Sequence, residues 1–237
     1  MLELKNVSFK ADGKEIIKNI SFNVEDSKFI VITGPNGGGK STLAKLIAGI
    51  YTPSSGSIIL DGNDITNLSI TDRAKLGISF AFQQPVRFKG VTVKDLITLA
   101  YGEEMSTISV CTYLSEVGLC AKDYIDREVN ASLSGGELKR IEIATIMARK
   151  TKISVFDEPE AGIDLWSFKN LINVFKKMHD EIKGSIIIIS HQERILNIAD
   201  EIIVLANGEL ISKGKKEDIL PSLLETTASC RFYSEEN

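Results

Sequence analysis

The stretch GPNGGGKST, residues 34–42, follows an apolar run and precedes a helical pattern. It matches G-x-x-x-x-G-K-[S/T], in which glycines turn backbone amides inward onto phosphate oxygens. Lys40 can neutralise the β- and γ-phosphates of a nucleotide, and the Ser41 hydroxyl can ligate Mg²⁺. A glycine-rich turn without this chemistry would need neither residue. We therefore predict a phosphate loop made of Gly34, Pro35, Asn36, Gly37, Gly38, Gly39, Lys40, Ser41 and Thr42.

Two adjacent carboxylates follow the apolar run ISVF. Asp157 is placed to hold Mg²⁺, often through a water, and Glu158 can act on the attacking water as a base or polariser. An acid pair at a strand end is by itself usually a solvated edge. Beside a phosphate loop, it predicts nucleotide hydrolysis.

Polar residues also follow two further apolar runs, ISFAF and SIIIIS. The Gln83 amide could touch both Mg²⁺ and water, with Gln84 as the alternative at this position. His191 is either a structural hydrogen-bond partner or a ligand of the γ-phosphate. We favour the second role because ligands of parallel sheets bind at the carboxyl ends of strands. The predicted metal ligands are Ser41, Gln83 and Asp157, and the predicted catalytic residues are Glu158, His191 and Gln83.

The stretch SLSGGELKR, residues 132–140, has the pattern of a helix start that can hold an anion. Ser134 can cap the helix, and Glu137 can reach back to the backbone amide of the cap. Gly135 and Gly136 leave the first amides uncovered, where the helix dipole is most positive. The chain therefore carries a second candidate phosphate cradle, far from the first in sequence.

The elements that must position these residues follow from the apolar periodicity. Residues from about 91 to 150 are mostly helical in pattern, and an amphipathic helix is expected over 165–182. A further helix follows the phosphate loop and closes at Gly49. Strands alternating with helices predict an α/β fold with a largely parallel sheet and an inserted helical subdomain. The expected strands are 2–9, 20–24, 28–33, 57–62, 78–82, 152–156 and 185–190, with a hairpin over 199–214.

Composition bounds the function classes. A net charge of −4 lacks the electrostatic footprint of nucleic-acid binding, so we expect no nucleic-acid partner. The longest apolar runs are too short to cross a bilayer, and the N-terminus lacks the pattern of a signal peptide. We expect a cytoplasmic protein, to which another chain would supply any membrane-spanning helices. Cys111, Cys120 and Cys230 lack the spacing of metal ligands and are expected to be reduced thiols.

Taken together, the motifs resemble those of the ATP-binding cassette (ABC) ATPases. In family order, GPNGGGKST is similar to their Walker A, AFQQP to the Q-loop, LSGGE to the signature, VFDEP to Walker B, EAGID to the D-loop and IISH to the switch histidine. The resemblance implies one nucleotide-binding domain over 1–237, with a RecA-like parallel core, an antiparallel β subdomain and a helical subdomain over about 84–150. It also implies an ATPase that uses ATP and Mg²⁺.

The resemblance also explains the second cradle. Domains of this family are implied to pair head to tail, with each ATP between the Walker A of one subunit and the signature of the other. Ser134, Gly135 and Gly136 would then contact the γ-phosphate held by the partner. The chain has one copy of each motif, so the pair is expected to be an ATP-dependent homodimer.

Within the family, GISFAFQQPVRFKGV, SGGELKRIEI and SHQERILNIAD are most similar to the SufC group, the ATPases of Suf-type iron–sulfur cluster assembly. Ala11 stands where most transporter ATPases carry an aromatic that stacks on adenine, and SufC-like chains commonly lack that aromatic too. Phe9 is a possible substitute, but we expect it in the core. Leu133, Pro159 and the hairpin sequence instead resemble transporter ATPases.

Two partners are therefore expected for one chemistry. The main hypothesis is an ATPase that deforms a soluble SufB/SufD-like scaffold, and the alternative is the motor subunit of a membrane permease. A non-catalytic binding module is disfavoured because every catalytic position is filled. The stretch QPVRFKGVTV, residues 84–93, suits a partner interface with an apolar centre and a charged rim, or else packs on its own helical subdomain.

Overall fold

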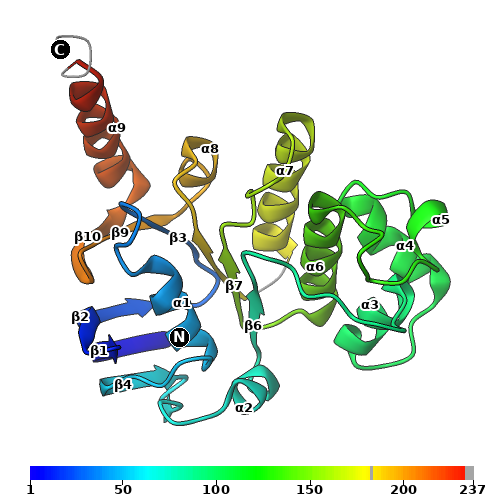
Figure 1. Ribbon diagram of the computed structural model, residues 1–237, viewed down its shortest axis with the longest axis horizontal. Helices are drawn as coiled ribbons and strands as arrows, with labels where there is room; N and C mark the ends of the chain where they lie inside the picture. Colours follow the sequence, from blue (N-terminus) through cyan, green and yellow to red (C-terminus); the bar gives the residue numbers. More distant parts are fainter. Residues whose placement is uncertain (182–183, 233–237) are drawn as a thin grey trace.

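Short runs of buried apolar residues form a parallel sheet at the centre of the molecule. The computed structural model describes residues 1–181 and 184–232, and every residue of β3 (Phe29–Thr33), β7 (Ile153–Asp157) and β8 (Ser185–Ile189) is buried. Such continuous apolar strands are typical of a sheet covered on both faces. The sheet order is β10-β9-β3-β8-β7-β6 (Figure 1), completed by β6 (Ile78–Ala81), β9 (Glu201–Ala206) and β10 (Glu209–Lys215).

A second, antiparallel sheet covers one face of the first. Its order is β2-β1-β4-β5, from β1 (Leu2–Ala11), β2 (Lys14–Val24), β4 (Ser55–Leu60) and β5 (Asn63–Asp64). Apolar residues of both sheets and of α1 (Lys40–Ala48) form one continuous buried cluster. This layer holds α1, and with it the preceding loop, against the ends of the parallel strands.

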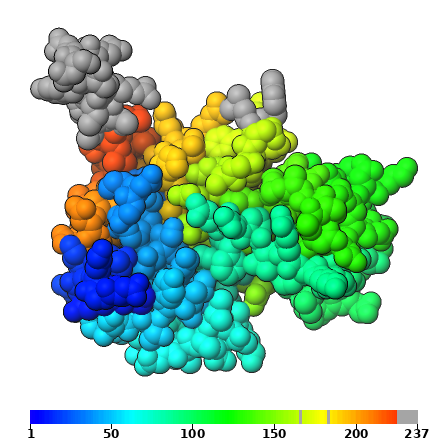
Figure 2. All heavy atoms as spheres, viewed as in Figure 1, coloured from blue at the N-terminus to red at the C-terminus, as the bar shows by residue number. Residues whose placement is uncertain are grey.

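The helical part projects to one side of the sheets (Figures 1 and 2). It contains α3 (Val93–Tyr101), α4 (Thr107–Glu116), α5 (Ala121–Tyr124) and the long α6 (Gly135–Arg149). The amphipathic α7 (Leu165–Glu181) covers the sheet, where Phe175 meets Phe29 and Phe156 edge to face. The remaining helices are α2 (Ile70–Lys75), α8 (Glu193–Leu196) and α9 (Lys216–Phe232).

The predicted α/β architecture is confirmed, but α2, α8, α9 and the short β5 were not expected, and some element boundaries differ. The strand expected at 20–24 begins at Lys14, because residues 14–19 pair with β1 across a turn in which Asp12 and Gly13 both have positive φ. Polar residues in that stretch hid the strand from a periodicity argument. The end expected for the helix at residue 182 lies outside the described residues.

Cysteines, metal ligands and membrane-spanning helices can be assessed in the described part of the chain. Cys111 and Cys120 are free thiols there, and the side chain of Cys230 lies outside it. Residues 1–181 and 184–232 contain no cluster of three or more His, Cys, Asp or Glu side chains that could hold a metal ion. Nor does any helix of this part combine the length and apolar character needed to cross a membrane.

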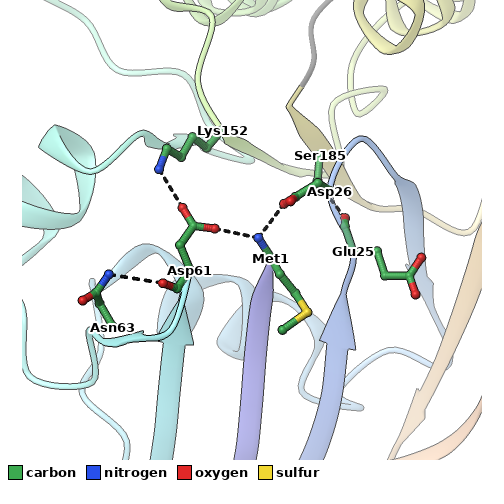
Figure 3. A network of polar contacts seen from close by, with 7 residues as sticks. All are labelled: Met1, Glu25, Asp26, Asp61, Asn63, Lys152 and Ser185. Carbon is green, nitrogen blue, oxygen red and sulfur yellow. Dashed lines mark hydrogen bonds and ion pairs between the residues drawn. The ribbon is translucent and has the colours of Figure 1, made fainter.

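A polar network ties the two sheets together at the end remote from the phosphate loop (Figure 3). The Met1 amino group donates to Asp26 at 2.5 Å and to Asp61 at 2.7 Å. Lys152, directly before β7, donates to the same Asp61 carboxylate at 2.6 Å, and this bond lowers the pKa of Asp61. Exposed ion pairs of this kind contribute little individually. Their effect here is to fix the relative position of the sheets beside the strand that carries the candidate catalytic acids.

Candidate functional site

The loop at residues 34–39 is packed tightly onto the end of β9. A Cβ on Gly34, whose φ is 136°, would lie 1.9 Å from the Leu205 carbonyl oxygen, and one on Gly38 would lie 2.9 Å from the same atom. The Gly208 amide also donates to the Gly38 carbonyl at 3.1 Å. Glycine is therefore required by packing at both positions. The loop is held rigidly in the shape that a phosphate cradle needs.

Lys40 and Ser41 begin α1 at the end of this loop. Lys40 is 7% exposed, and its ammonium group donates to the carbonyls of Gly34 at 2.8 Å and Pro35 at 2.9 Å. Burial lowers the pKa of Lys40, and the nearby carboxylates of Glu158 and Asp157 oppose that shift. A cavity of about 350 Å³ lies over the loop and is lined by Ile16, residues 36–42 and Glu158. Glycine-rich backbone and a cation along one cavity fit the phosphates of a nucleotide.

Ser41 and Asp157 come together across the sheet end. The Ser41 hydroxyl donates to Asp157 Oδ1 at 2.9 Å. Burial raises the pKa of Asp157, which is 3% exposed, and the bond from Ser41 opposes the shift. Hydroxyl and carboxylate oxygens are the hard ligands that Mg²⁺ prefers. The pair fits a magnesium ion beside the phosphate cradle.

Gln83 contacts the predicted catalytic acid, Glu158. Its Nε2 donates to Glu158 Oε2 at 2.8 Å. The two residues follow β6 and β7, which are parallel neighbours, so their side chains emerge at the same edge. The predicted metal and catalytic residues Ser41, Asp157, Glu158 and Gln83 therefore form one contiguous group.

Glu158 is also held by its backbone, and here the structure adds a residue that the motif analysis did not assign. The Glu158 φ is 47°, its amide donates to Ile189 O at 3.0 Å, and its carbonyl accepts from Lys139 Nζ at 2.5 Å. Lys139 is 3% exposed, and burial lowers its pKa against the attraction of four acids, Glu142 first. Lysines are seldom buried unless paired, so a Lys-Arg pair in a helix gives no sequence signal for this contact.

His191 lies exposed just past the end of β8. Its neighbour Ser190 donates to Glu160 Oε1 at 2.5 Å, and burial raises the pKa of Glu160 against that bond. The adjacent His191 likewise acts to lower the pKa of Glu160. The γ-phosphate contact of His191 stays a prediction.

The second cradle has the predicted helix start but lies outside the cavity over the phosphate loop. Ser134 caps α6 by accepting from the Glu137 amide at 3.3 Å, and Glu137 Oε2 accepts from the Ser134 amide at 2.7 Å, which confirms the capping box. The Tyr124 hydroxyl donates to the other Glu137 oxygen, and this bond lowers the pKa of Glu137. A Cβ on Gly135 would meet no neighbouring part of the described chain within 4 Å, so the first turn is open to another molecule.

Ala11 stands at the position expected for a base-stacking aromatic, and the nearby aromatic Phe9 has another role. Phe9 packs on the core and stacks on Tyr51 with ring centroids 5.0 Å apart, as expected for a core residue. Ile16, on β2 beside the loop, is an apolar residue that lines the phosphate-loop cavity. Motif reasoning missed it because the strand start at Lys14 was not recognised.

Comparisons of sequence and of structure with known proteins point to the same family. Residues 17–161 match the model of the ABC transporter family. An uncharacterised ABC transporter ATP-binding protein of Methanocaldococcus jannaschii is 37% identical over 92% of this chain and 90% of its own length. The energy-coupling factor transporter ATP-binding protein EcfA1 of Ligilactobacillus salivarius is 36% identical over 92% of this chain and 79% of its own. The dimeric structure of a bacterial ABC transporter cassette superposes with a TM-score of 0.81 at 25% identity, covering 91% of this chain and 99% of that one.

Proposed function

Because the chain belongs to the ABC transporter family of ATPases, we propose that it is the ATP-hydrolysing motor subunit of a membrane transporter. The chain is an ATPase with the ABC fold, and its relatives are described as transporter ATP-binding proteins. The observation that carries the proposal is the grouping of Lys40, Ser41, Asp157, Glu158 and Gln83 at one sheet edge. We place the subunit on the cytoplasmic side, where ATP is abundant.

The chemistry follows from the contacts. Lys40 exchanges its two loop carbonyls for β- and γ-phosphate oxygens, while the loop amides hold the phosphates. Ser41 and Asp157 would hold Mg²⁺, which would supply positive charge to the phosphates. Glu158 accepts a proton from the attacking water, and Gln83 orients the Glu158 carboxylate from the neighbouring strand. His191 completes the edge as a contact for the γ-phosphate.

We propose that two copies close head to tail on two ATP molecules. The open first turn of α6 supports this, since Ser134, Gly135 and Gly136 face no group of their own phosphate loop and would contact the partner's γ-phosphate. Phosphate release then removes the shared ligand and lets the pair open.

The permease is proposed to dock beside the segment that carries Gln83. Val86 and Phe88 are 46% and 39% exposed, and both line an apolar groove of about 200 Å³ between β6, α3 and α6. An apolar centre of this kind suits a protein partner. Movement of the segment would link the partner to the catalytic group.

A second candidate function keeps the chemistry and changes the partner to a SufB/SufD-like iron–sulfur scaffold. One observation favours it. In the stretch SGGELKRIEI, which resembles the SufC group, Lys139 donates to the Glu158 carbonyl and Glu142 accepts from the Phe82 amide. We rank this candidate second because the similar proteins are described as transporter ATP-binding proteins.

Affinity purification of the tagged chain from native cells tests the choice. We expect a membrane permease in stoichiometric amount, and its loss in Phe88→Asp. Ile108→Asp is the matched control, because Ile108 is 79% exposed on α4 and does not line the groove. Recovery of a soluble iron–sulfur scaffold without a permease would replace the proposal with the second candidate.

A further inference from the structure

The segment that carries Gln83 is held differently at its two ends. At its start, the Phe82 amide donates to Glu142 Oε1 at 3.1 Å. At its far end, the Phe88 amide donates to the Val129 carbonyl at 2.8 Å. Its start therefore depends on a side chain of α6, whereas its end depends on backbone.

Glu142 occupies an unusual place for a carboxyl group. It lies in the apolar groove among aromatic and aliphatic side chains, including Phe80, Phe82, Leu96 and Ile141. Carboxylates are seldom buried without a partner, because desolvation disfavours their charge. A side chain retained in such surroundings against this cost is a candidate for a role other than packing.

The charges that act on Glu142 can be named. Among the described residues that line the groove, Arg149 is the other charged one, and both are on α6. The residues that β6, the Gln83 segment and α3 contribute to the groove are uncharged. Burial raises the pKa of Glu142 to about 7, against the Phe82 amide and the attraction of Lys139.

We propose that Glu142 is a positioning residue for hydrolysis, whose carboxylate anchors the Phe82 amide and thereby places Gln83 against Glu158. The chain of contacts is short, since Gln83 is the next residue and donates to Glu158 Oε2 at 2.8 Å. The inference rests on the proposed roles of Gln83 and Glu158. An ionised carboxylate accepts a hydrogen bond roughly twice as strongly as a neutral group does. Ionisation of Glu142 therefore tightens the anchor, and protonation loosens it.

The sign of the pH dependence follows. The carboxylate is ionised above its pKa of about 7, so the anchored population rises as pH rises through neutrality. Turnover should rise with it, whereas binding at the phosphate loop should not, because Glu142 does not line that cavity.

The test measures kcat for MgATP hydrolysis and the MgADP dissociation constant on the full chain and its variants. Glu142→Leu should lower kcat about tenfold, the effect of losing one hydrogen bond to a charged group. The MgADP affinity should stay within about twofold, a few tenths of a kcal/mol. In a Gln83→Ala background, Glu142→Leu should cause no further loss, because it acts through Gln83. Glu142→Gln keeps the shape but cannot ionise, and should remove the rise in kcat centred near pH 7.

Three results would overturn the inference: an unchanged kcat in Glu142→Leu, multiplicative losses in the double variant, or a wild-type pH profile in Glu142→Gln. Thermal unfolding of each variant separates these results from misfolding, and an apolar residue in place of a buried carboxyl is expected to keep the fold. Glu158→Gln is assayed in parallel. Full hydrolysis by Glu158→Gln would refute the proposed catalytic roles themselves, whereas an inactive Glu158→Gln beside an unaffected Glu142→Leu would refute the positioning role alone.

Discussion

The phosphate loop and the first turn of α6 both present backbone amides beside glycines, yet the two sets of glycines have different causes. A side chain on Gly34 would collide with the Leu205 carbonyl at 1.9 Å, so the fold of this chain requires glycine there. On Gly135 a Cβ would meet nothing within 4 Å, and on Gly136 it would meet only ordinary contact, the Gly162 carbonyl at 3.6 Å.

This difference between the glycines goes with a difference in the charged groups that lie around the phosphate loop and around the first turn of α6. The phosphate loop shares one cavity with its own cation, Lys40, and with Glu158, and Asp157 accepts a hydrogen bond from Ser41 beside it. The first turn of α6 is fixed by its capping box and has no such surroundings. Packing within the chain does not require glycine at positions 135 and 136, which fits a turn that contacts a second molecule. The variants below test the difference between this turn and the phosphate loop.

The largest effect is expected for Glu158→Gln. The amide keeps the shape but cannot accept the proton from water, so hydrolysis should fall by roughly 10²–10⁴-fold. If the α6 turn completes the site of another copy, this variant should accumulate as a dimer with MgATP. Size-exclusion chromatography with and without MgATP measures the dimer. A variant that stays monomeric at saturating MgATP would contradict the head-to-tail pair.

Lys40→Ala should weaken MgATP binding by about a hundredfold or more, since two charge-assisted contacts of roughly 1.5–3 kcal/mol each are lost. Calorimetry measures the affinity. Lys122→Ala, an exposed lysine on α5, removes the same charge far from the loop and should bind normally. Wild-type affinity in Lys40→Ala would mean that the loop is not a self-contained phosphate site.

The glycines themselves give a matched pair. Gly34→Ala should destabilise the chain by about 3 kcal/mol, because the new methyl group overlaps a backbone oxygen at positive φ. Gly135→Ala lies in a helix with open space around it and should raise stability by up to about 1 kcal/mol. Denaturant unfolding of both variants measures the difference. Equal stabilities of the two variants would contradict the conclusion that packing requires glycine at position 34 but not at position 135.

An effect smaller than the stability difference between Gly34→Ala and Gly135→Ala is expected for Gly135→Leu. Its monomer should fold and bind MgATP as wild type does, because the side chain points into open space. ATP-dependent dimerisation should weaken by about tenfold, or ~1.4 kcal/mol, because the side chain occupies the face offered to the partner's phosphate. Sedimentation in the Glu158→Gln background measures this. Unchanged dimerisation would place the partner's phosphate elsewhere.

Much of the fold and the candidate site could be predicted because the relevant patterns are local. The alternation of strands with helices predicted a largely parallel sheet, and polar residues directly after parallel strands must meet at one edge. The capping box at Ser134 and Glu137 was readable for the same reason, since its two bonds join residues three apart. Distances between strands are not local, so the contact between Gln83 and Glu158 needed the structure.

The residues missed by motif reasoning all act across long sequence separations. Lys139 reaches the Glu158 carbonyl, Glu142 reaches the Phe82 amide, and Ile16 lines the cavity over residues 36–42. Each stands in a stretch whose local pattern indicates something else, a solvated helix face or a polar turn. The desolvation that perturbs the pKa values of Lys139 and Glu142 exists only after the helix packs on the sheet.

By itself, the sequence determined the phosphate loop, the acid pair after β7, the capped turn of α6 and the α/β order, because each depends on residue types at fixed short spacing. The tertiary structure alone decided which of those groups touch and which glycines the fold requires. It also decided that the buried lysine bonded to the Glu158 carbonyl is Lys139. The reason is physical: hydrogen bonds, desolvation and steric overlap depend on distances between atoms, and only the packing of distant segments fixes those distances.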